Sequence, residues 1–178
     1  MADDVALLES VLTKTEALIS EVGPEQQLLR TPCPDLDVRH LVDHLVGWAR
    51  ECARRVTGQE SSEDPNAYRS DDPAREFEQA AARLVSGLRE TDQPAMPPGM
   101  LLMEFITHGW DLATATGEPV TYSDAEADTA LATGRTMLRP DYRGDSFGPE
   151  VDPPDDATAV ERLVAFLGRD PGWHATSD

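Results

Sequence analysis

A run of apolar residues in the second half of the chain contains one carboxylate and one imidazole, Glu104 and His108, in the stretch MLLMEFITHGW. Four positions are just over one helical turn, so both side chains lie on one face of a helix. A carboxylate among Leu, Met, Phe and Ile is costly to bury unless a positive charge compensates it. A divalent metal ion does so directly, and both residue types are ordinary metal ligands. The pair therefore predicts a metal site.

Two more histidines, His40 and His44, lie four positions apart in the segment VRHLVDHLVGWARECARRV. At about 100° per residue, His44 falls at the flank of the apolar stripe, and His40 falls closer to solvent. If the two helices pack together, His44 completes a His–Glu–His set with Glu104. Three protein ligands with one open position are typical of catalytic zinc, whereas a fourth, such as Cys33 or His40, would indicate a structural site. On spacing alone, a salt-bridged pair without metal stays an open alternative.

Three further residues are candidates for the surroundings of this site. Asp111 falls on the same polar seam as His108 and is expected to orient that imidazole or a bound water. Trp48 and Trp110 are candidate walls of a pocket, with plain packing between helices as the alternative.

The elements that position these residues are expected to be helices. Apolar periodicity and boundary residues place them at about 3–22, 38–56, 73–88, 98–117, 124–138 and 157–167. Asp37 and Ser123 are expected N-caps, Pro73 suits a first turn, and Gly117 ends the helix of Glu104. The pattern favours an all-α bundle of four long antiparallel helices with shorter helices after them, in one domain over residues 1–178 whose tail after about 170 is flexible.

Composition limits the partners. With 34 acidic against 15 basic residues, the 178-residue chain has a net charge of −19, which disfavours nucleic acid and anionic membrane surfaces. No apolar stretch reaches the roughly 20 residues that span a bilayer. The first residues, MADDVALLES, are acidic, where a signal peptide is basic. We therefore expect a cytoplasmic protein whose Cys33 and Cys52 are thiols, the second one a buried apolar residue.

The same motifs carry a family resemblance. TPCPDLDVRHLVDHLVG resembles the second-helix segment of the DinB-like metal-binding bundles of actinobacteria, a group related to the N-terminal domain of mycothiol-dependent maleylpyruvate isomerase. EFITHGWDLATATGEP resembles the other motif of that group, and FGPEVDPPDDATAVERLVAFLGRDPGW is similar to the end of its stand-alone members. The resemblance implies an up-down-down-up four-helix bundle. It also implies that His44, Glu104 and His108 bind a divalent metal, which is zinc in the isomerase.

The resemblance leaves the reaction open. Family members often have a Trp just before the second helix, where this chain has Leu36 and Asp37. The isomerase also has a C-terminal domain that contributes to its active site, whereas only two modest helices are expected after Gly117, which argues against maleylpyruvate isomerisation itself. The enzyme hypothesis is S-transfer or thiol-assisted isomerisation with a low-molecular-weight thiol such as mycothiol. The alternative is a non-catalytic metal-dependent small-molecule-binding or stress-response module. Zinc is the expected metal, nickel, iron and manganese are alternatives, and a homodimer is one open oligomeric state.

Overall fold

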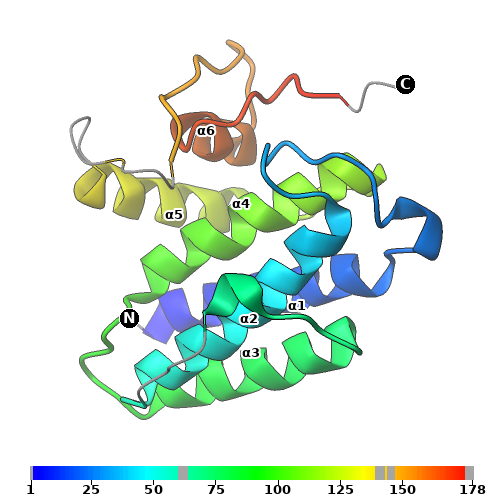
Figure 1. The fold of residues 1–178 in the computed structure, drawn as a ribbon. Coiled ribbons are helices and arrows are strands. Elements are labelled where there is room, and N and C mark those ends of the chain that lie inside the picture. Colours follow the sequence, from blue (N-terminus) through cyan, green and yellow to red (C-terminus); the bar gives the residue numbers. More distant parts are fainter. Residues whose placement is uncertain (1, 60–63, 139–142, 144–146, 175–178) are drawn as a thin grey trace.

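The computed structural model describes residues 2–59, 64–138, 143 and 147–174. These residues contain no strand, only an isolated bridge between Arg30 and Asp37. The fold is therefore all-α, as predicted. In chain order, the elements of the described residues are α1 (Ala2–Ser20), η1 (Pro24–Gln26), α2 (Val38–Val56), η2 (Pro65–Ala67), α3 (Pro73–Arg89), α4 (Pro98–Thr116), α5 (Asp124–Met137) and α6 (Ala159–Phe166) (Figure 1).

Helices α1 to α4 form a bundle of up-down-down-up topology (Figure 1). At one end, Arg89 in the last turn of α3 contacts Glu9 of α1, with 2.6 Å between Nη2 and Oε2, so these two helices run in opposite directions. At the other end, Gln26 just after α1 donates to the main-chain oxygen of Thr116 at the end of α4, at 3.2 Å. Helices α1 and α4 therefore run in the same direction, and α2 and α3 both run against them.

Two neighbouring pairs, α1 with α4 and α2 with α3, are parallel, which corrects the expectation that the long helices are antiparallel throughout. Gly87 near the end of α3 lies against Val56, the last residue of α2. A helix of 19 residues is about 28 Å long, and extended chain covers that distance in about nine residues at about 3.3 Å each. The connection 57–72 is long enough to return the chain along the bundle, and helical periodicity does not encode that return.

The helix boundaries that matter for the site follow from local chemistry. Helix α2 begins and ends where predicted. It begins after Asp37 because the carboxylate of this residue accepts a hydrogen bond from the main-chain nitrogen of His40 at 2.9 Å. Helix α4 begins at Pro98, as predicted from the prolines before it. It ends at Gly117, whose φ of 79° is the left-handed conformation that glycine adopts without strain.

Two other boundaries differ from prediction. Helix α1 ends at Ser20 rather than near Val22, because its last turn tightens: the nitrogen of Val22 bonds to the oxygen of Ile19, three residues back. Helix α6 begins at Ala159 rather than at 157, because Thr158 forms the N-terminal cap.

The core lies between the four long helices and contains leucine side chains from each of their apolar stripes, with one phenylalanine from α3 and one from α4. Phe77 of α3 meets Phe105 of α4 edge to face, with ring centroids 5.8 Å apart. The largest fully buried side chains are Phe77, Phe105, Leu8, Leu12, Leu41, Leu45, Leu84, Leu101, Leu102, Ile106, Leu112 and Leu163. Because α4 is buried over most of its circumference, polar side chains on it have few ways to reach water.

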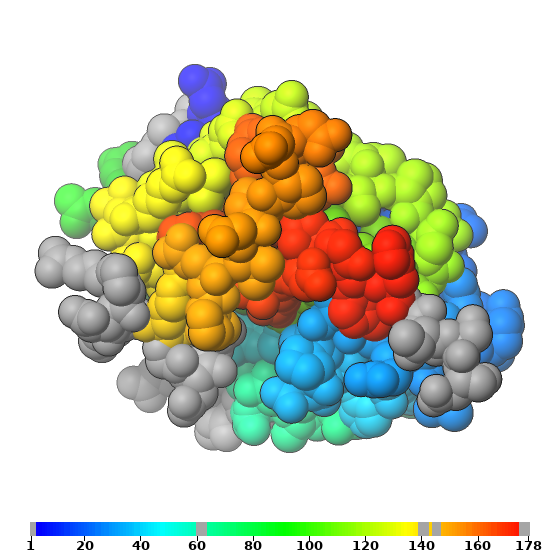
Figure 2. All heavy atoms as spheres, turned by 90° about the horizontal axis from the view of Figure 1, so that it is seen from above, coloured from blue at the N-terminus to red at the C-terminus, as the bar shows by residue number. Residues whose placement is uncertain are grey.

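The later elements cover one side of the bundle. Helix α5 packs on α4, and α6 packs on both α5 and α4 (Figure 1). Figure 2 shows the C-terminal segment (residues 147–174), in orange to red, beside the connection that precedes α2, in light blue. Gly148 and Gly168 pack backbone to backbone, since a Cβ on Gly168 would lie 2.7 Å from the Cα of Gly148. Among the described residues, no helix combines the length and the apolar character that a membrane crossing requires.

Candidate metal centre

The antiparallel packing of α2 against α4 brings the three predicted ligand side chains together. Nε2 of His44 lies 3.1 Å from Oε1 of Glu104, and Nε2 of His108 lies 3.6 Å from the same oxygen. The two imidazole rings meet edge to face, with centroids 4.6 Å apart. His44, Glu104 and His108 each offer one ligand atom, and these atoms lie within 4.8 Å of one another. The structure thus brings together all three residues that the sequence selected.

This donor set fits a divalent metal ion. Two imidazole nitrogens and one carboxylate oxygen suit zinc and the neighbouring transition metals. The three side chains also line a cavity of about 610 Å³, so an ion held by them would keep a face toward open space. The other described lining residues come from the connection before α2, from α2 and η2, from α4 and from the C-terminal segment: Pro32, Cys33, Pro34, Asp35, Leu36, Trp48, Asn66, Met103, Thr107, Phe147, Gly148, Gly168 and Arg169.

The electrostatics of the three residues are strongly coupled. Burial favours the neutral form of Glu104, but the imidazoles of His108 and His44 outweigh it and lower the pKa of this carboxyl to about 2. Burial likewise disfavours the charged form of His108, and the carboxylates of Glu104 and Asp111 outweigh it and raise its pKa. Without a metal, the raised pKa of His108 favours its protonated form, which supplies positive charge next to Glu104.

Asp111 lies one turn beyond His108 and is fully buried. Its Oδ2 is 3.1 Å from Nδ1 of His108, and because a carboxylate only accepts, Nδ1 carries the proton. Nε2 of His108 is thereby directed toward Glu104. Asp111 also accepts hydrogen bonds from Nη2 and Nε of Arg169, at 3.1 and 3.4 Å. The guanidinium, whose side chain is 10% exposed, balances the buried charge of Asp111.

The two predicted tryptophans have different surroundings. Trp48 lines the cavity and lies beside His44, with ring centroids 6.1 Å apart. Trp110 is 4% exposed and belongs to the hydrophobic core, because its position on α4 faces the bundle. The plain-packing interpretation therefore describes Trp110, and it is not among the described residues that line the cavity.

Neither candidate for a fourth ligand joins the three side chains. His40 is largely exposed, and its Nδ1 contacts the capping carboxylate of Asp37 at 2.7 Å. Cys33 lines the same cavity but groups with His108 and Asp111, each offering one atom within 4.8 Å of the others. Burial and the nearby Asp111 raise the pKa of the Cys33 thiol. The second cysteine, Cys52, is fully buried as predicted, and burial raises its pKa to about 12.

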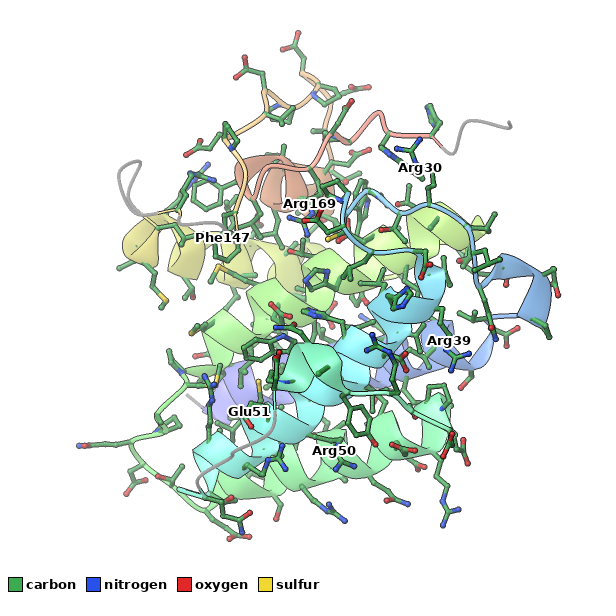
Figure 3. The ribbon with its side chains drawn as sticks, viewed as in Figure 1. Arg30, Arg39, Arg50, Glu51, Phe147 and Arg169 are labelled. Atoms are coloured by element: carbon green, nitrogen blue, oxygen red, sulfur yellow. The ribbon has the colours of Figure 1, made fainter. Side chains whose placement is uncertain are left out.

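Three residues that contribute to the site could not be identified from the sequence: Asn66, Arg169 and Phe147. Phe147 precedes α6 in the chain and Arg169 follows it. Figure 3 shows Arg169 between α6 and α4. Arg169 lies 58 positions after the carboxylate that it contacts, and Asn66 lies 22 positions after the histidine that it contacts. The only available signals were a lone arginine after the last helix and a lone asparagine in a polar loop.

Comparisons with known proteins place the sequence in a family. Two uncharacterized proteins of Mycobacterium tuberculosis, from strains CDC 1551 / Oshkosh and ATCC 25618 / H37Rv, are each 29% identical to this chain over 168 residues. These alignments cover 86% of this chain and 90% of each relative. No solved structure matches the chain. The sequence profile of the mycothiol maleylpyruvate isomerase N-terminal domain matches residues 8–113, which include His44, Glu104 and His108. The chain therefore belongs to the family of mycothiol maleylpyruvate isomerase N-terminal domains.

Proposed function

We propose that the protein binds a divalent metal ion, preferentially zinc, through His44, Glu104 and His108. With this ion the protein acts on a low-molecular-weight thiol such as mycothiol. The reaction class is S-transfer or thiol-assisted isomerisation. The observation that carries the proposal is the convergence of three ligand atoms within 4.8 Å at the wall of a cavity of about 610 Å³. That volume lies within the range of small-molecule sites, about 300–1,000 Å³.

The residues around the cavity have separable roles in this proposal. A bound divalent ion supplies Lewis-acid chemistry, which lowers the pKa of a thiol or water next to it. Asp111 holds the proton on Nδ1 of His108, and so keeps Nε2 free for the ion. Trp48 and Phe147 give the cavity an apolar wall against which a substrate can be desolvated. Arg169 donates hydrogen bonds to Asp111, and its positive charge offsets the negative charge of that carboxylate.

Charge supports a thiolate as the partner of the ion. Among the charged lining and supporting groups that are not exposed, Glu104 and Asp111 carry two negative charges and Arg169 carries one positive charge, which gives a net charge of −1 with neutral imidazoles. Asp35 also lines the cavity, but it is exposed, so solvent screens its charge. A divalent ion changes this to +1. One thiolate neutralises the site, whereas a neutral ligand leaves a positive charge in a partly buried cavity.

A non-catalytic binding module is the second candidate, and it is favoured by a specific feature of the lining. The Cys33 thiol has a raised pKa, and the carboxylate of Asp111 is bonded to both His108 and Arg169. Neither is a free general base. In this alternative the same metal site organises a pocket for a small molecule without turnover.

Elemental analysis of protein purified without added metal tests the metal site. We expect about one divalent ion per chain, and a protein that neither retains nor binds zinc in titration would refute the proposal. Calorimetric titration of mycothiol into zinc-loaded and metal-free protein tests the thiol. Heat of binding only with the zinc-loaded protein, absent for S-methylated mycothiol, supports thiol chemistry. Equal binding of the S-methylated compound would favour the binding module.

A further inference from the structure

Asn66 is the only asparagine in the chain, and its amide oxygen contacts two side chains of α2. Oδ1 lies 3.0 Å from Nδ1 of His44 and 3.2 Å from Nε1 of Trp48. His44 and Trp48 are one helical turn apart, so η2 presents a single acceptor to both.

The indole of Trp48 decides which way the amide faces. An indole N–H only donates, so the group next to it must be the oxygen of Asn66 rather than the NH₂. The same oxygen faces Nδ1 of His44, which must then carry a proton to make a hydrogen bond. The other ring nitrogen, Nε2, is the one that lies 3.1 Å from Glu104.

We propose that Asn66 is a positioning residue, which fixes the Nδ1–H form of His44 so that Nε2 is the metal-binding atom. This inference rests on the proposed metal site. In this arrangement the two imidazoles have matching supports, because an oxygen acceptor holds Nδ1 of each ring. The acceptor is Asn66 for His44 and Asp111 for His108. Both Nε2 atoms then face the same oxygen of Glu104. Such supporting hydrogen bonds set the orientation and basicity of histidine ligands.

The backbone around η2 is built to hold this contact. Gly47 of α2 allows the close approach, because a Cβ there would lie 2.2 Å from the main-chain oxygen of Pro65. The Asp64 carboxylate accepts from the main-chain nitrogen of Asn66 at 3.0 Å, and Arg69 donates to its main-chain oxygen at 3.2 Å. Several independent contacts therefore hold the main chain at Asn66, from which its side chain reaches α2.

Zinc affinity of the full chain, measured by competition with a chromophoric chelator, tests the proposal. We expect Asn66→Ala to weaken zinc binding by about 10- to 100-fold, the usual cost of losing such a support. Asn66→Asp keeps an oxygen acceptor and should restore most of the affinity. Trp48→Phe, which frees the amide to rotate, should cost less than Asn66→Ala. Gln93→Ala removes an exposed amide between α3 and α4 and is the matched control, with no expected change.

Long-range ¹H–¹⁵N NMR of the zinc-loaded protein gives a second readout that a merely structural role would not change. We expect His44 to show a protonated Nδ1 and a zinc-bound Nε2 in the wild type and in Asn66→Asp. Zinc bound through Nδ1, or unchanged affinity in Asn66→Ala, would overturn the role of Asn66 while leaving the metal site intact. Absence of zinc binding by the wild type would instead overturn the proposed function, and this inference with it.

Discussion

Glu104 faces both imidazoles of the candidate centre, and its charge is the feature on which the metal proposal depends most. Replacing it by Gln keeps the shape and removes the charge. We expect Glu104→Gln to lower zinc affinity by at least about 100-fold, because one ligand and the compensating charge are lost together. The metal-free variant should still fold, with a lower melting temperature, because the ion pairing that lowers the pKa of Glu104 is lost.

Zinc stoichiometry and the melting temperature of the metal-free protein, measured on the same sample, check this expectation. Glu78→Gln, on the exposed face of α3, is the matched control. Normal zinc content in Glu104→Gln would eliminate Glu104 as a ligand and reduce it to an ion-pair partner of the histidines.

The pH dependence of zinc binding follows from the raised pKa of His108. A proton on Nε2 excludes the metal from that atom, so affinity should fall as the pH drops through the folded-state pKa of this histidine. Because that pKa is raised by Glu104 and Asp111, the loss should begin above the ordinary value of about 6.5. Chelator competition between about pH 5.5 and 8 measures the effect, and a flat profile would show that the histidines are not ligands.

At the scale of residues, spacing identified the three candidate ligands and Asp111, which supports His108 from the same helix, but not the supports that come from other segments. Four-residue spacing on an amphipathic helix determines a shared face, which is why His44, Glu104 and His108 could be selected from the sequence. Asn66 and Arg169 belong to a loop and to a C-terminal segment without periodicity. Their contacts depend on how the chain returns to the bundle, which local patterns do not record.

At the scale of elements, Gly109 shows how closely α4 approaches the segment before α5. A Cβ on Gly109 would lie 1.7 Å from the hydroxyl oxygen of Tyr122, and that hydroxyl is hydrogen-bonded to Thr15 of α1 at 2.8 Å. We expect Gly109→Ala to lower the free energy of unfolding by about 2–3 kcal/mol, through overpacking in a site that cannot expand. Tyr122→Phe removes the nearest atom, so the double variant should lose less than the sum of the single losses.

Urea unfolding of the two single variants and the double variant measures this coupling. Ala82→Gly, on the outer face of α3, is a control for the intrinsic preference of helices for alanine over glycine. Strict additivity of the two changes would contradict the close packing of Gly109 against Tyr122.

The extents of α2 and α4 could be predicted because capping and terminating residues lie next to their apolar stripes. The directions of the helices could not be predicted from these patterns. A two-residue difference at the start of α6 came from overlooking Thr158 as a cap. The parallel pairing of α2 with α3 depends on the connection 57–72, whose composition indicates only that it is solvated. Resemblance to a family supplied the topology that local chemistry lacked.

For the whole molecule, the balance of buried charges predicts how the metal-free protein responds to pH. The pKa of Glu126 is lowered: burial opposes the charged form, but bonds from Lys14 of α1, at 2.8 Å, and from the cap at Ser123 outweigh burial. The pKa of Glu104 is lowered to about 2 in the same way, by His108 and His44 against the effect of burial. Carboxyls with a lowered folded pKa add stability above their unfolded pKa of about 4.3 and lose it as the pH falls toward the folded value.

The contribution of His108 to stability changes with pH in the opposite direction. Its raised folded pKa adds stability below the unfolded pKa of about 6.5, and that contribution disappears as the pH rises through the folded value. We therefore expect the metal-free protein to be most stable between about pH 4.5 and 6.5, with a steep loss below about 4 and a shallower loss above about 7.

Urea unfolding at a series of pH values measures the profile. Glu126→Gln should flatten its acid side, and Glu104→Gln should flatten both sides because His108 then loses the carboxylate that raises its pKa most. A profile that neither variant changes would mean that these buried pairs do not set the stability of the bundle.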